Sequence, residues 1–161
     1  MVRVLGDAFF ICGFGLVRLA GDDARHLAWG QGSILSRLTG DSEEAAVRLA
    51  AAYKAAYDAA SRQFDFLDTL TGKARPEMCA FAASPAEVER VANTGKRVIM
   101  TGLENGYPVG EDLANVKAFY DRGARYITLT HSGHNQSGDS SSDRNLPRNN
   151  GLSPFGKQVV A

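Results

Sequence analysis

The sequence contains only two cysteines, Cys12 and Cys79, which lie too far apart to form a Cys-x-x-Cys pair. This spacing suggests neither a disulfide framework nor a cysteine-ligated zinc site. The chain also lacks an excess of charge of either sign, because 18 basic residues balance 18 acidic residues. That balance argues against a nucleic acid or an anionic membrane as a partner bound through a basic surface.

An uninterrupted apolar run long enough to span a bilayer is also missing, so no membrane-spanning segment is predicted. The most apolar stretch, residues 1–17, is interrupted by Asp7 and ends before Arg18. A secretory signal peptide needs an unbroken apolar centre and a small-residue cleavage site, and Asp7 breaks that centre. We therefore predict a buried strand within residues 1–17 and favour a cytoplasmic protein, with a signal-like segment as the alternative.

The composition that is present is typical of one globular domain. The 161 residues are enough for a single hydrophobic core, and 44% of them are hydrophobic while 22% are charged. Residues 1–161 are therefore treated as one domain. Residues 19–40 show no clear period, and His26 has no second ligand type at a useful spacing. We interpret His26 as a packing or surface residue.

A long helix is predicted from about residue 42 to residue 66. Asp41 can cap its first turn, and Glu44 lies three residues later, as in a capping box. The turn-rich residues 71–73 are expected to follow the helix. Its residues at helical spacing form one apolar stripe, which indicates contact with a core: Leu49, Ala50, Tyr53, Tyr57, Ala60 and Phe64.

A short strand and a capped helix are predicted next. The apolar residues 78–82 indicate the buried strand. Residues 84–87, of sequence Ser-Pro-Ala-Glu, supply an N-cap serine, a proline at the first helical position and a glutamate three residues after the cap. The helix is expected to bury Val88 and Val91 and to end at Gly95.

Residues 96–131 are expected to fold as strand, helix and strand. The strands are predicted at 97–103 and 125–130, and the helix at 111–122. Two strands joined by a helix in so short a segment predict parallel neighbours with a right-handed crossover, and hence an α/β fold. The helix is expected to bury one face, made of Leu113, Val116 and Tyr120.

Two polar residues, Glu104 and His131, follow the ends of these two strands. The carboxyl ends of parallel strands open onto one face, so we expect the two side-chain heads to lie within about 10 Å of each other. A carboxylate and an imidazole in this arrangement could be metal ligands, an acid–base pair or substrate-binding groups. The alternative is that Glu104 is a solvated loop acid and that His131 caps the following turn.

The composition changes sharply after His131. Residues 132–150 are rich in Ser, Asn, Asp and Gly and predict a long loop, directly after a strand end, where binding loops lie. His134 is interpreted as a loop residue or as one that supports the site. Asp139 and Asp143 could orient other groups, although solvated loop acids are expected by default.

Three motifs carry a resemblance to a known family. They are residues 101–108 (Thr-Gly-Leu-Glu-Asn-Gly-Tyr-Pro), 124–132 (Ala-Arg-Tyr-Ile-Thr-Leu-Thr-His-Ser) and 150–156 (Asn-Gly-Leu-Ser-Pro-Phe-Gly). In this order and spacing they resemble the membrane dipeptidase family, also called renal dipeptidase. The resemblance covers about residues 42–161, whereas residues 1–40 match poorly.

The resemblance implies a fold, a reaction and two site residues. The family is similar to amidohydrolases and has a (β/α)8 TIM barrel, with parallel strands and outer helices, that holds two zinc ions. It hydrolyses the peptide bond of a dipeptide with metal-activated water. By resemblance, Glu104 is the carboxylate that bridges the two metals. His131 is the catalytic residue that binds the dipeptide substrate and stabilises the tetrahedral intermediate.

The sequence also departs from the family pattern. The family ligates one metal through a His-x-Asp pair, which does not occur here, and takes two more histidines from later strands. A full barrel needs roughly 250 residues. The chain is therefore expected to be the N-terminal to middle part of a barrel, weakly active or inactive, with doubtful zinc binding. The alternative is a non-catalytic α/β remnant or interaction module that self-associates through open strand edges.

Overall fold

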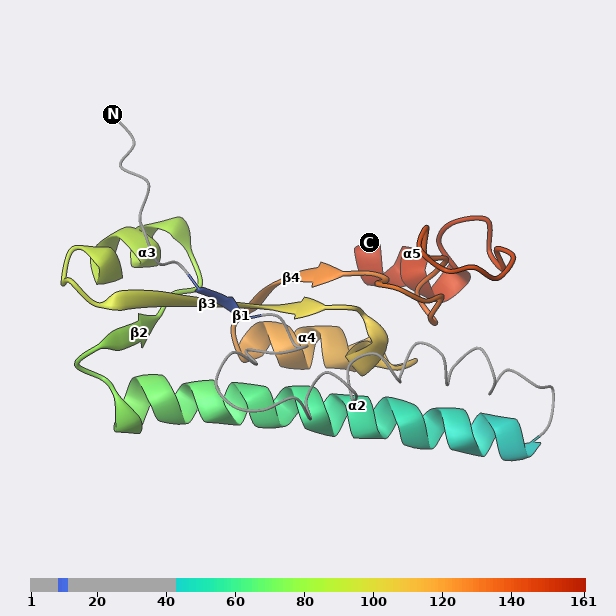
Figure 1. The fold of residues 1–161 in the computed structure, drawn as a ribbon, viewed down its shortest axis with the longest axis horizontal. Helices are drawn as coiled ribbons and strands as arrows, with labels where there is room; N and C mark the ends of the chain where they lie inside the picture. Colours follow the sequence, from blue (N-terminus) through green and yellow to red (C-terminus); the bar gives the residue numbers. More distant parts are fainter. Residues whose placement is uncertain (1–8, 12–42) are drawn as a thin grey trace.

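The structure is a computed structural model that describes residues 9–11 and 43–161. Asp7, His26 and Asp41, which were discussed from the sequence, lie outside these described residues. Within them the elements, in chain order, are β1 (Phe9–Ile11), α2 (Glu43–Thr69), η1 (Leu70–Ala74), β2 (Cys79–Phe81), α3 (Pro85–Ala92), β3 (Arg97–Glu104), η2 (Tyr107–Val109), α4 (Ala114–Asp121), β4 (Ala124–Thr128) and α5 (Pro154–Val160) (Figure 1).

β3 is the strand with which the other three strands of the described sheet pair, all of them in parallel. β2 pairs with the first half of β3 and β4 with its second half, where Glu104 lies opposite Thr128. The predicted strands 97–103 and 125–130 are therefore parallel neighbours, which confirms the predicted α/β unit. β1 confirms that a strand lies within residues 1–17.

α2 runs beneath the sheet, along most of the length of the sheet (Figure 1). Its predicted apolar stripe is largely confirmed, although Ala50 is exposed. The helix continues past Phe66 to Thr69, and the π-helical turn η1 takes the place of the predicted turn at residues 71–73. The helix extends past Phe66 because Leu67, which is buried, continues the apolar stripe and packs against Cys79 and Ile99 under the sheet.

α3 begins as its sequence predicts. The Ser84 hydroxyl accepts a hydrogen bond from the Glu87 backbone N–H at 3.3 Å, and the Glu87 carboxylate accepts one from Ala83 at 2.7 Å. These bonds satisfy free N–H groups of the first turn. Val91 is buried and packs against Val98 of β3. The predicted helix and its inward face are confirmed.

α4 differs from its prediction in both start and orientation. The 3₁₀ turn η2 precedes it, and the Asp112 carboxylate accepts a hydrogen bond from the Ala114 N–H at 2.9 Å, so the helix begins at Ala114 and not at 111. The predicted buried face was wrong for Leu113 and Tyr120, which are 39% and 58% exposed, whereas Val116 is half-buried and packs against the core. Phe119, which is 1% exposed, is the buried residue of this helix.

The main core lies between α2, α4 and the second half of the sheet, directly under the ends of β3 and β4. Gly123 connects α4 to β4 with a φ of 102°, a conformation that glycine adopts without strain. α5, whose first turn is capped by the Ser153 side chain, contributes Phe155 to the edge of this core. The buried members of the cluster are Ala60, Phe64, Leu103, Val109, Phe119 and Ala124.

No helix among the described residues is both long enough and apolar enough to cross a membrane.

Candidate functional site

Glu104 and His131 lie together at the carboxyl ends of β3 and β4. The His131 Nε2 atom is 3.5 Å from the Glu104 Oε1 atom, well within the predicted 10 Å. The two side chains are 56% and 36% exposed for His131 and Glu104, so both reach solvent. The expected placement is confirmed, with the correction that Glu104 is the last residue of β3 and not the first residue beyond it.

The residue after Glu104 fixes the course of the following loop. Asn105 has a φ of 93°, a left-handed conformation that asparagine tolerates better than most residues. Its backbone N–H donates a hydrogen bond to the Thr128 hydroxyl at 2.6 Å, and its side-chain oxygen accepts one from the Tyr107 N–H at 3.2 Å. The end of β3 is therefore held against the end of β4.

The loop after β4 is held together by buried polar contacts. His134 is buried, and its Nδ1 atom accepts a hydrogen bond from the Ser140 N–H at 2.9 Å. The Ser140 hydroxyl in turn donates to the backbone carbonyl of His131. His134 therefore contacts the site indirectly, through Ser140. This contact fits the second of its two predicted roles, that of a residue that supports the site.

The expectation that Asp139 and Asp143 are solvated loop acids was wrong. Their side chains are only 9% and 10% exposed, respectively. The Asp143 carboxylate accepts hydrogen bonds from the N–H groups of His134 at 2.8 Å and Asn145 at 2.9 Å. The loop forms around these acids because it has almost no apolar side chains with which to build a core.

Asp139 accepts hydrogen bonds from three backbone N–H groups on the far side of the loop. Burial alone would raise the pKa of its carboxyl. The bonds from Asn149, Arg148 and Gly151 outweigh burial, because they favour the charged form, and lower the pKa to about 2. The loop should therefore lose stability in acid.

We predict the direction of this effect from the two states of Asp139. The pKa of its carboxyl is about 2 in the folded protein and 3.8 ordinarily, so the unfolded chain binds more protons between these values. The free energy of unfolding should therefore fall as the pH falls from about 4 to about 2. Asp139→Asn should make this slope shallower in thermal unfolding measured across that range. The exposed acid Asp121 is the control, and equal slopes for Asp139→Asn and Asp121→Asn would contradict the prediction.

Sequence reasoning missed two residues that contact the site, Ser140 and Asn135. Ser140 contacts the backbone of His131, and Asn135 contacts the loops after both β3 and β4. The available signal was the polar composition of residues 132–150 directly after a strand end. That composition indicated a binding loop, but it has no period that selects single residues.

The described residues do not complete a zinc site. They contain no group of three or more His, Cys, Asp or Glu side chains that could hold a metal ion. Glu104 and His131 offer two donors, whereas zinc is almost always bound by four ligands, of which at least three come from protein.

A comparison with protein families decides the assignment. The profile of the membrane dipeptidase family (Peptidase family M19) matches residues 38–161. The chain belongs to the membrane dipeptidase family. The resemblance predicted from the three motifs is confirmed, and the match begins within a few residues of the predicted position 42.

The chain is also similar to individual proteins that are named dipeptidases. The chain is 31% identical over 88 residues to dipeptidase aclJ of Aspergillus oryzae, which covers 53% of this chain and 21% of that protein. It is 32% identical over 74 residues to dipeptidase tcpJ of Claviceps purpurea, covering 46% of this chain and 17% of that protein. The chain thus spans about a fifth of the length of these dipeptidases.

Solved structures of the same kind share the fold. The probable dipeptidase PvdM from Pseudomonas aeruginosa superposes with a TM-score of 0.63 at 30% identity, covering 68% of this chain and 28% of that one. An amidohydrolase from the same organism gives 0.58 at 20% identity, covering 64% of this chain and 30% of that one, which shows the fold alone. The predicted α/β fold, part of an amidohydrolase-like barrel with parallel strands, is confirmed.

Proposed function

We propose that this chain forms part of the catalytic face of a metallo-dipeptidase that hydrolyses dipeptides. The observation that carries the proposal is the 3.5 Å approach of His131 to Glu104 at the ends of adjacent parallel strands. Active sites of barrel enzymes lie on this face. Membership of the dipeptidase family supplies the reaction class, hydrolysis of a peptide bond.

The two side chains take different roles in this proposal. Glu104 would hold the catalytic metal, which would supply an activated water for hydrolysis. His131 would bind the dipeptide and would donate a hydrogen bond from its imidazole to the oxygen that gains charge during hydrolysis. Its exposure of 56% leaves the ring open to a ligand, and its Nδ1 atom lies 3.4 Å from the Ser132 hydroxyl.

A zinc titration by calorimetry tests the role of Glu104. Glu104 alone supplies a metal ligand in this proposal, whereas zinc usually takes about four, so we expect weak, saturable binding. Glu104→Gln should lower the affinity on the order of tenfold or more, because it removes a charged ligand. Glu77→Gln is the matched control, since Glu77 is an exposed acid of the same type far from the site. Absence of any zinc binding, or equal affinity in the two variants, would remove Glu104 from the metal site.

We predict negligible hydrolysis of dipeptides by the purified chain, even with zinc added. The physical reason is the incomplete set of metal donors among the described residues. The measurement is release of free amino acids from a panel of dipeptides, with and without zinc. A zinc-dependent turnover that Glu104→Gln abolishes would overturn the prediction and show that the chain is a complete enzyme.

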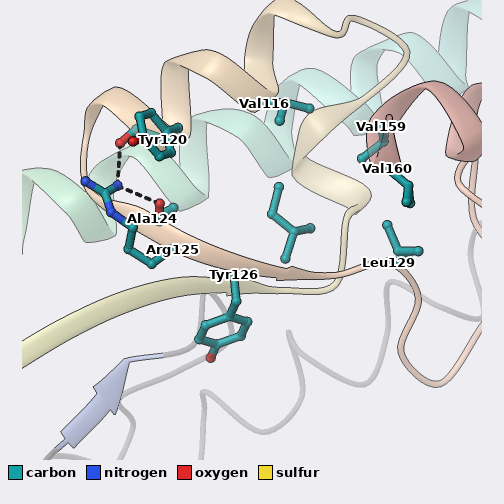
Figure 2. A pocket seen from close by; sticks show the side chains of 9 residues that line it. Val116, Tyr120, Ala124, Arg125, Tyr126, Leu129, Val159 and Val160 are labelled. Atoms are coloured by element: carbon teal, nitrogen blue, oxygen red, sulfur yellow. Dashed lines mark hydrogen bonds between the residues drawn. The ribbon is translucent and has the colours of Figure 1, made fainter. Parts of the chain in front are cut away.

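A second candidate function, an interaction module that binds another copy of itself, is favoured by one observation. A groove with a volume of about 360 Å³ lies between α4, β4 and α5. Figure 2 shows the side chains that line it. Arg125 lies at its edge and donates hydrogen bonds to the carbonyls of Tyr120 and Ala124, both at 2.9 Å. The groove is mostly apolar, with walls that include Val116, Ile127, Leu129, Val159 and Val160.

Sedimentation at several protein concentrations tests this second candidate. An apolar groove beside a strand edge favours self-association. We therefore expect the mean mass to rise with concentration and Val160→Asp to prevent the rise. A strictly monomeric wild-type chain at all concentrations would exclude the module and leave the dipeptidase proposal standing.

A further inference from the structure

The side chain of Asn135 contacts both of the loops that carry the candidate site. Its Nδ2 atom donates one hydrogen bond to the Asn105 side-chain oxygen at 2.8 Å and another to the Leu129 carbonyl at 2.7 Å. Asn105 is the residue directly after Glu104, and Leu129 lies two residues before His131. The amide therefore bridges the chain segments on which the two site residues stand.

The hydrogen-bonding capacity of this amide is used in one orientation only. Its oxygen accepts a hydrogen bond from the Ser137 N–H at 2.8 Å, so both donors and the acceptor have partners. The opposite orientation would place the oxygen against two other oxygen acceptors. Asn135 is 9% exposed, so water cannot readily replace these contacts.

Two more contacts connect the same loops. The Gln136 side-chain N–H donates to the Gly106 carbonyl at 2.8 Å, and the Gly106 N–H donates to the Leu129 carbonyl at 3.3 Å. The Leu129 carbonyl thus accepts hydrogen bonds from Gly106 and from Asn135. Asn135 is the side chain of this set whose donors reach both loops, at 2.7 and 2.8 Å.

We propose that Asn135 is the positioning residue of the site and that its amide holds Glu104 and His131 at their working separation. This inference rests on the proposed function, because it assigns Asn135 to the Glu104–His131 pair. Asn135 itself acts only through the two loops. Without its two donors, the segments after β3 and β4 would lose the one side chain that contacts both of them and would keep the contacts of Gln136, Gly106 and Thr128.

The simpler reading is that Asn135 only closes its own turn through the bond to Ser137. The variant Asn135→Asp separates the two readings. Aspartate keeps an acceptor for the Ser137 N–H but removes both donors and turns a negative oxygen toward Asn105 and Leu129. A turn-closing role would therefore tolerate Asn135→Asp, whereas the positioning role would not.

The test measures the effect of the Glu104 carboxylate on the NMR signal of the His131 ring, without metal or substrate. The readout is the NMR shift of the His131 Cε1 proton at a pH of about 8.5, two units above the ordinary imidazole pKa. In the wild-type background, Glu104→Gln should change this shift, because the carboxylate lies 3.5 Å from the ring. In the Asn135→Asp and Asn135→Ala backgrounds, the same substitution should cause roughly half of that change or less.

Two controls keep the result specific. Asn145→Ala removes a neighbouring exposed amide of the same loop and should leave the change at its wild-type size. If the Asn135 variants do not fold, Asn105→Gly removes one acceptor of the bridge while tolerating the φ of 93° at that position. It should also reduce the change. A change of wild-type size in every folded Asn135 and Asn105 variant would overturn the proposal.

The outcome is independent of the zinc titration. One outcome is that the chain binds no zinc, while the Asn135 variants reduce the effect of Glu104→Gln on the His131 signal. This outcome would refute the metal role of Glu104 and retain Asn135 as the residue that sets the separation of Glu104 and His131. Zinc binding together with full coupling in Asn135→Asp would keep the proposed function and remove Asn135 from it.

Discussion

Replacement of Phe119 by alanine is expected to lower the free energy of unfolding by about 3–5 kcal/mol. Phe119 is 1% exposed, and its ring centre lies 5.1 Å from that of Tyr57 and 5.7 Å from that of Phe64. Truncation removes these contacts and leaves a cavity between α2 and α4. Urea denaturation monitored by circular dichroism measures the loss.

The neighbouring Tyr120→Ala variant is the matched control, since it truncates an aromatic residue of the same helix. Tyr120 is 58% exposed, and its ring contacts the Arg125 guanidinium at 4.3 Å. The substitution removes this cation–π contact from a mostly exposed side chain, so the expected cost is about 0.5–1 kcal/mol. Equal losses for the two variants would mean that the buried face of α4 has been assigned to the wrong residue.

Gly156→Ala is expected to destabilise the protein by about 3 kcal/mol or more, at the upper end of what overpacking costs. A Cβ atom at Gly156 would lie 1.8 Å from the Ser137 carbonyl oxygen. Backbone cannot move aside as a flexible side chain can, so α5 must separate from the loop. The hydrogen bond from the Ser153 N–H to the same oxygen, at 3.0 Å, should break as well.

Gly72→Ala tests the same substitution at a position where the added Cβ atom has no close neighbour. No atom lies within 4 Å of a Cβ at Gly72, which is part of the helical turn η1. Alanine there should be neutral or stabilising by up to about 1 kcal/mol. Thermal unfolding of both variants, with hydrogen exchange at Ser153, checks the pair. Similar unfolding of both would show that α5 does not pack on Ser137.

The elements that the sequence predicts well are those whose signal is local. Ser84 and Pro85 mark the start of α3, and the stripe through Tyr53 and Phe64 defines the buried face of α2. The strands around Glu104 and His131 follow from short apolar runs joined by a short crossover. Their parallel pairing then places the two side chains on one face, which is why the geometry of the pair could be predicted.

The buried face of α4 could not be predicted in full because helical spacing allows two stripes that share Val116. One stripe adds Leu113 and Tyr120, and the other adds Phe119, which is the one that packs against α2. Which of these faces packs is decided by residues about 60 positions earlier in the chain. Periodicity within one helix carries no information about them.

The polar contacts of residues 132–150 could not be predicted for a different reason. They join side chains to backbone groups at irregular separations, as from Asp139 to Gly151 or from Asn135 to Asn105. Such bonds leave no repeating pattern in the sequence. The family resemblance identifies the motifs on either side of the loop and gives no role to its interior.

The hydrogen bonds of Asp139 determine which amino-acid substitutions this loop can accept. Its order depends on the reach of a short carboxylate to the N–H groups of Arg148, Asn149 and Gly151, and not on the burial of apolar surface. Side-chain length should therefore matter more than hydrophobicity. A change as conservative as Asp139→Glu, which keeps the charge and adds one methylene, should disturb the loop, whereas polar replacements of the 86% exposed Leu146 should be accepted.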